Sequence, residues 1–134
     1  MISVGGNNAL SSSDFLEEPS RSTGDEFERC YLAMLAGVLS RGLHTAICTV
    51  YYPRFPDAAL QKVAVAALTV FNDCIVRAAF THSLPLLDLR LICAEEEDYA
   101  NPIEPSARDG EKIAQATAEY VEQGPIGGRT EVFT

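Results

Sequence analysis

The chain carries its most suggestive polar residues close to its start. The string 5–8, Gly-Gly-Asn-Asn, directly follows the β-prone segment 2–4. Paired glycines let the backbone turn sharply and approach a ligand closely. An Asn amide at the end of a strand can donate a hydrogen bond to the oxyanion that develops during acyl transfer. Because Gly and Asn in series also form ordinary turns, the surrounding residues decide between the two interpretations.

A second group of polar residues lies between 95 and 106. The four acids of 95–98 lack the spaced ligands of a calcium loop, so we expect them to be solvated. Asn101 and Glu104 follow. A glutamate carboxylate can act as a general base, although it accepts protons less readily than imidazole, and it is also favourable as a solvated charge beside a helix N-terminus. Both interpretations of Glu104 stay open.

Histidine and cysteine are sparse. The chain contains two histidines, His44 and His82, and four cysteines. The cysteines stand singly in apolar segments, without the CxxC spacing of a zinc site or a redox pair, and we expect buried free thiols. The sequence therefore predicts no cofactor and no metal.

Hydrophobic periodicity predicts three strands and three helices in alternation. The strands are expected over 2–4, 45–52 and 84–93, and the helices over 23–42, 57–81 and 106–124. Such alternation indicates parallel strands joined by right-handed crossovers. The predicted fold class is α/β, a three-layer αβα sandwich with a doubly wound, flavodoxin-like parallel sheet. The tail after the last helix has no assignment.

Local signals refine the helices. The Thr-x-x-Glu pattern at Thr23 and the residues Asp57 and Ser106 predict the three helix starts. In the long middle helix, Asn72 is expected on a solvated side together with Asp73 and Arg77. The apolar face expected for the last helix consists of Ile113, Ala114, Thr117, Ala118 and Val121.

The order of the strands predicts where any chemistry gathers. In open parallel sheets, ligands bind beyond the carboxyl ends of the strands. The segments that follow the three predicted strands are 5–8, 53–55 and 90–104, and we expect them along one edge. Both histidines precede strands, so they belong at the opposite edge and are not expected to serve a Ser-His-Asp arrangement.

Composition favours one globular domain over 1–134. The chain is 47% hydrophobic and 22% charged, which suits a packed core, and the Ser-rich stretch 9–24 is typical of a surface loop. The formal charge of −9 disfavours binding to nucleic acid or anionic membranes. No signal peptide is recognisable, and the longest apolar run, 63–71, is too short to span a bilayer. We expect a cytoplasmic protein without membrane contact.

Both polar groups lie in strings that resemble segments of SGNH/GDSL-type ester hydrolases. The string 2–10, ISVGGNNAL, is similar to the Gly-x-Asn-Asp segment, and the resemblance makes Asn7 an oxyanion-hole donor, with Asn8 in place of Asp. The string 101–106, NPIEPS, followed by KIA at 112–114, looks like the segment that carries Asp-x-x-His-Pro before the last helix. The resemblance implies a serine acyl-enzyme mechanism on a small-molecule ester.

The chain also departs from that family. Matched residue by residue, Asn101 stands where the family has its catalytic Asp, and Glu104 where it has its catalytic His. Nothing matches the Gly-Asp-Ser nucleophile segment, which follows the family's first strand. The predicted strands would then be the third to fifth of a sheet ordered 2-1-3-4-5, in an N-terminally truncated domain that is inactive alone. The open edge at 2–4 predicts self-association.

The alternative is a non-catalytic binding or scaffold module that kept the α/β frame after losing the three catalytic residues. The residues found at positions 101 and 104 favour this alternative. A Gly-Asp-Ser segment upstream of Met1 in the same reading frame would favour the enzyme, whereas a genuine start at Met1 would favour the module.

Overall fold

The computed structural model describes residues 1–3, 21–123 and 129–134, and it has a mixed helical and parallel-stranded fold. The elements are α3 (Arg21–Leu39), β1 (Ile47–Cys48), α4 (Ala58–His82), β2 (Leu86–Leu87), α5 (Leu89–Ile92), the 3₁₀ turn η1 (Glu96–Asp98), α6 (Ala107–Gln123) and β3 (Val132–Phe133). All three predicted long helices are present, with bounds that differ from the predicted ones by at most three residues.

The strands form a parallel sheet in the order β1-β2-β3. Ile2 extends this sheet on the β1 side as a single parallel bridge to Ile47. The Ile2 amide donates to Ala46 O over 2.8 Å, and the Cys48 amide donates to Ile2 O over 3.2 Å. The predicted α/β class with parallel strands is confirmed.

The predicted strand lengths need correction. The segment 84–93 contains only β2, because Asp88 caps α5, and 45–52 contains only β1, because the chain beyond it bonds to a side chain of α4. The segment 2–4 contributes only the Ile2 bridge, and its last residue lies outside the described residues. The strand β3 was missed, because two residues in an unassigned tail carry no periodicity.

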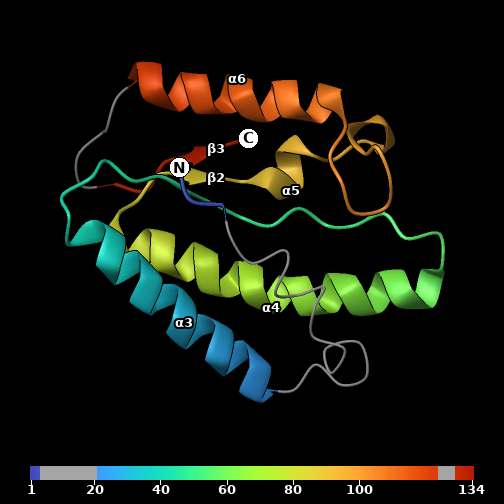
Figure 1. Ribbon diagram of the computed structural model, residues 1–134, viewed down its shortest axis with the longest axis horizontal. Helices are drawn as coiled ribbons and strands as arrows, with labels where there is room; N and C mark the ends of the chain where they lie inside the picture. The colour runs from blue at the N-terminus through green and yellow to red at the C-terminus, as the bar shows by residue number, and fades with distance from the viewer. Residues whose placement is uncertain (4–20, 124–128) are drawn as a thin grey trace.

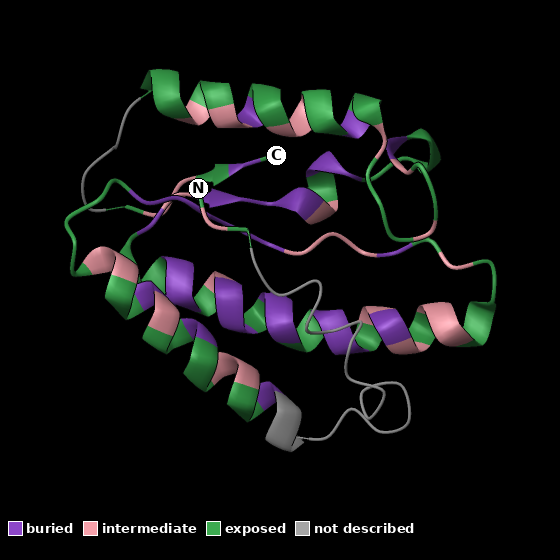
Figure 2. Cartoon of the chain, viewed as in Figure 1, coloured by how far each residue is buried: buried purple, intermediate pink, exposed green. Residues whose placement is uncertain are grey.

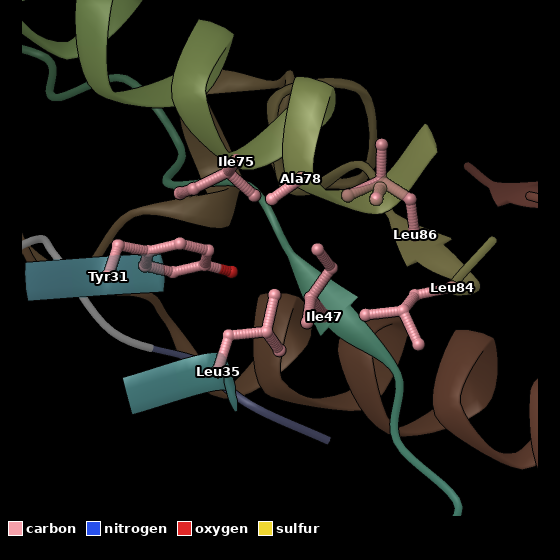
Figure 3. Packing of buried hydrophobic residues seen from close by; sticks show 8 residues of the cluster. Tyr31, Leu35, Ile47, Ile75, Ala78, Leu84 and Leu86 are labelled. Carbon is pink, nitrogen blue, oxygen red and sulfur yellow. The ribbon is translucent and has the colours of Figure 1, made fainter. Parts of the chain in front are cut away.

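Helices cover both faces of the sheet, with α3 and α4 on one side of the strands and α6 on the other (Figure 1). Ile47 and Leu86 pack with α3 and α4 in one hydrophobic cluster, in which Figure 3 also shows Tyr31. Cys48 and Leu87 belong to a second cluster with α5, α6 and β3. Because both faces are covered, the strand segments are apolar without alternation, as the sequence indicated.

The two connections between strands pass on opposite faces. Helix α4 joins β1 to β2 on one face, and α6 joins β2 to β3 on the other. Both steps run in the same direction across the sheet, so the two crossovers have opposite hands. The crossovers that the sequence predicted are those from Ile2 to β1 and from β1 to β2, and they share one hand because α3 and α4 lie on the same face. The opposite hand belongs to the connection to β3, a strand that was not predicted. Strand twist selects the hand, and the two-residue strand β3 contributes little twist.

The helix starts follow the predictions in part. The Asp57 carboxylate caps α4 by accepting from a first-turn amide over 2.7 Å, as expected. Helix α3 begins at Arg21, inside the predicted loop 9–24, so Thr23 lies within the helix and is not its N-cap. The rest of that predicted loop, 9–20, lies outside the described residues.

Helix α4 is long and apolar enough to cross a membrane by length and composition alone, but half of the qualifying window is buried inside the protein. Core helices pass the same test, and α4 packs against α3 and β1. The predicted solvated side is confirmed for Asp73 and Arg77, which form an exposed ion pair at 3.0 Å. It is wrong for Asn72, which is 0% exposed.

Helix α6 is rotated relative to its predicted apolar face. The residues that face the sheet are Asp109, Ile113, Ala116 and Tyr120. Val121 is instead 67% exposed, and Ala114 and Ala118 are also exposed. Figure 2 shows exposed residues along the side of α6 that faces away from the sheet. The helical period was right, but the apolar face in the sequence is wider than the face that the described residues cover.

Candidate functional site

A polar cluster of the buried Thr49 and Asp88 with the partly buried Arg90 lies at the carboxyl ends of β1 and β2. Thr49 Oγ1 donates to Asp88 Oδ1 over 2.9 Å. Arg90 donates to the same carboxylate from Nε over 2.8 Å and from a terminal nitrogen over 2.6 Å. Burial acts to raise the pKa of Asp88, but the hydrogen bonds from Arg90 and Thr49 outweigh it and hold that pKa below its usual value. The cluster fixes both segments where they leave the sheet.

Asn72 of α4 holds the segment that follows β1. Its Oδ1 accepts from Val50 N over 2.7 Å, and its Nδ2 donates to Val50 O over 2.8 Å. The side chain thus pairs with the backbone much as a neighbouring strand would, which satisfies a fully buried amide. A lone Asn in an apolar helix was the only sequence signal for this role, and its neighbour Asp73 pointed to the wrong side.

Two of the three predicted site segments meet at this edge. Arg54 N donates to Pro102 O over 2.7 Å, and the Arg54 guanidinium donates to Ala94 O while lying 5.5 Å from the centroid of the Tyr99 ring. Tyr99 Oη donates to Tyr52 O over 2.6 Å. The prediction that the segments after β1 and β2 share one edge is therefore confirmed.

Of the predicted site residues, Asn101 and Glu104 lie side by side, whereas Asn7 lies outside the described residues. Asn101 Oδ1 accepts from the backbone amides of Ile103 and Glu104, both over 3.0 Å. Asn101 Nδ2 donates to the Glu104 carboxylate. Both side chains are exposed. Asn101 therefore shapes a turn and orients the Glu104 carboxylate at the same time.

The two histidines lie away from this edge. His44 immediately precedes the segment that forms β1, and His82 is the last residue of α4, before β2. Both are exposed. Because the strands are parallel, these positions are at the amino ends, and the prediction that neither histidine reaches the carboxyl edge is confirmed.

One acid of the run 95–98 is buried, contrary to the prediction that the run is solvated. Asp98 is 0% exposed and accepts from Lys112 Nζ over 2.8 Å and from Glu95 N over 2.9 Å. Burial acts to raise the pKa of Asp98, but the Lys112 ammonium outweighs it and lowers that pKa. The turn η1 reverses the chain and brings the carboxylate against α6. The Glu95-x-x-Asp98 spacing, which forms a capping box, was the signal available.

A second buried acid, Asp109, forms no ion pair with any of the described residues. It is 1% exposed, and one of its carboxylate oxygens has no hydrogen-bond partner among the described residues. The Cys93 thiol lies close to the carboxyl group, and burial raises the pKa of both groups. A thiol with a raised pKa is a poor nucleophile. No local feature of the sequence marks Asp109 as buried.

All four cysteines are free, as expected. Cys48, Cys74 and Cys93 are buried, but the prediction of burial is wrong for Cys30, which lies on the exposed side of α3. Within the described ranges, no group of three or more His, Cys, Asp and Glu side chains could hold a metal ion.

A partly open cavity of about 270 Å³ lies beside the end of β3. It is lined by Leu91, Ile92, Lys112, Gln115, Ala116, Glu119 and Thr134. This lining does not include Asn101 or Glu104, so the cavity is separate from these two residues.

No family model matches the chain, and neither a curated protein nor a solved structure does.

Proposed function

We propose that the chain is part of an SGNH/GDSL-type ester hydrolase, with Asn7 as a donor to the oxyanion and Glu104 at the position of the family's histidine. One observation carries the proposal. The turn with Glu104 lies at the carboxyl edge of the sheet, bonded to the segment that follows β1. Ile2 runs parallel to β1, so its carboxyl side points to the same edge of the sheet. On this basis we assign Asn7, five residues further along the sequence, to one site with Glu104.

The finer fold in this proposal is a doubly wound αβα sandwich with an incomplete sheet. Ile2, β1 and β2 take the third, fourth and fifth positions of the order 2-1-3-4-5, with α3 and α4 on one face and α6 on the other. Two further strands would pair on the open side of Ile2. The strand β3 departs from this order, because it adds a position beyond the fifth.

The mechanism assigns each group a step. In the intact parent, a serine hydroxyl attacks the ester carbonyl, Glu104 accepts the hydroxyl proton, and the Asn7 amide stabilises the oxyanion. The proton then passes to the leaving alcohol, and water hydrolyses the acyl-enzyme with Glu104 again as the base. Because no segment of this chain matches the family's nucleophile segment, we expect the chain alone to be inactive.

The incompleteness is tested with a short-chain aryl ester. The chain and its Asn7→Ala variant should both release phenol no faster than the ester hydrolyses in buffer alone, because neither has the nucleophilic serine. Gln115→Ala removes an exposed amide elsewhere, on α6, and serves as the control. Turnover by the chain that Asn7→Ala abolishes and Gln115→Ala retains would overturn the proposed incompleteness.

A second candidate is a non-catalytic α/β binding or scaffold module. The Asn101 side chain favours it, because both of its polar atoms are engaged in the turn that ends at Glu104. A residue used in this way stabilises local structure without any reaction. The two candidates differ in whether the carboxyl edge recognises a tetrahedral ester mimic.

A further inference from the structure

The sheet is open on the outer side of Ile2. The amide and the carbonyl of Ile2 both bond toward β1, so the backbone groups of Met1 and Ser3 alternate to the other side. Both of these residues are exposed, and no described strand lies beyond them. An open edge of this kind offers backbone donors and acceptors to another strand.

One side of α6 carries no charge and lies on this same side of the molecule. We define this uncharged flank as Gly110, Ala114, Thr117, Ala118 and Val121, which project from adjacent positions around the helix. Thr117 Oγ1 lies 3.6 Å from Met1 Sδ, which places the flank above the Ile2 edge. The opposite flank of α6, with Lys112 and Glu119, borders the cavity beside β3 instead.

The uncharged flank is an exception on the surface of this acidic protein. The chain has a formal charge of −9, so two copies repel each other over most approaches. The remaining outward positions of α6 are mostly charged, with Arg108, Glu111, Lys112, Glu119 and Glu122. Val121 stands 67% exposed in the flank, and Met1 beside it is 53% exposed. This apolar surface can approach an identical surface without like-charge repulsion.

We propose that two copies of the chain form a symmetric dimer through the Ile2 edge and the uncharged flank. A two-fold axis normal to the sheet makes the two Ile2 segments antiparallel neighbours and keeps both α6 helices on the same face. The uncharged flanks then face each other across the axis, with Met1 and Val121 between them. Such an interface is self-complementary, as two-fold symmetry requires. The dimer is a property of this chain alone, because in the proposed intact parent two further strands occupy the Ile2 edge.

The area of the proposed interface determines how tightly the dimer is expected to associate. Stable dimers commonly bury about 800 Å² on each partner, and one helix flank with a three-residue edge is smaller than that. We therefore expect a reversible dimer with a dissociation constant on the order of 10 µM.

Sedimentation equilibrium between about 1 and 200 µM tests the proposal. The average mass should rise with concentration toward that of a dimer. Val121→Glu should raise the dissociation constant at least about tenfold, because it brings two carboxylates together at the axis. Leu43→Glu changes the charge equally at a residue that is 59% exposed on the loop before β1, and it should leave the association unchanged. A monomer at every concentration, or equal behaviour of the two variants, would overturn the proposal.

Cross-linking tests the arrangement itself. In a Cys30→Ser background, the other native cysteines are buried. Ala118→Cys should then give covalent dimers with a short bis-maleimide, because the flanks face each other. Leu91→Cys, on α5 beside the cavity and away from the uncharged flank, should not. Cross-linking of the second variant alone would show that the interface lies elsewhere and would overturn the proposal.

Discussion

Asp88 and Glu104 are carboxylates at the same edge of the sheet, but their surroundings differ. Asp88 is 5% exposed and accepts hydrogen bonds from Thr49 and Arg90. Glu104 is exposed, and its partner Asn101 lies only three residues away in the same turn. The cluster of Thr49, Asp88 and Arg90 holds the two segments that leave the sheet in place, and we call it the frame. The exposed turn presents the Glu104 carboxylate beside this frame. The frame and the candidate chemistry are therefore separable by mutation.

The largest effect is expected for Asp88→Ala. The substitution leaves the partly buried Arg90 guanidinium and the buried Thr49 hydroxyl without their common partner. We expect the free energy of unfolding to fall by about 3 kcal/mol, as measured by urea denaturation. Asp73→Ala removes a carboxylate that is 60% exposed and paired with Arg77, and it should cost no more than about 0.5 kcal/mol. Equal losses in the two variants would contradict the distinction.

The pH dependence of this effect has a definite sign. The pKa of Asp88 is lowered in the folded protein, mainly because bonds from Arg90 and Thr49 overcome burial. Its stabilising contribution is present above the unfolded pKa of about 3.9 and is lost as the pH falls through the folded value. The difference between the protein and Asp88→Ala should therefore shrink below about pH 4. A difference that grows on acidification would contradict the account.

A third carboxyl group, Asp109, is buried like Asp88 but forms no ion pair with a described residue, so it shows the effect of burial alone on stability. Burial raises its pKa, so its contribution to stability is full below the unfolded pKa and is lost as the pH rises through the folded value. Asp109→Asn removes that loss and should stabilise the protein by about 1 kcal/mol at pH 7, with little effect near pH 3. Thermal melts at the two pH values measure the difference. Destabilisation at pH 7 alone would show that the Asp109 charge has a partner.

The smallest effect is expected for Glu104→Gln. The side chain is exposed, and a glutamine oxygen can still accept from Asn101 Nδ2. The free energy of unfolding should change by less than about 0.5 kcal/mol. A loss comparable with that of Asp88→Ala would mean that the turn is part of the frame, and the comparison would fail.

The helices were predictable because their signals are local. Capping by Asp57 and the helical period of α4 and α6 depend on residues close in sequence. The edge shared by the segments after β1 and β2 followed from parallel topology alone. The inward direction of Asn72 and Asp98 did not, because Val50 and Lys112, which bond to them, are distant in sequence. The strand β3 needs β2 as a template, and the two-residue segment carries no period of its own.

The central claim is that the carboxyl edge, and not the histidine edge, recognises an ester. An alkyl trifluoromethyl ketone, which in water forms a neutral tetrahedral hydrate, mimics the intermediate without needing the serine. Titrated to about 10 mM into the isotope-labelled protein, it should shift the side-chain amides of Asn7 and Asn101 and the backbone amide of Glu104, and Asn7→Ala should weaken its binding. An absence of binding, or shifts centred on His44 and His82, would contradict the account.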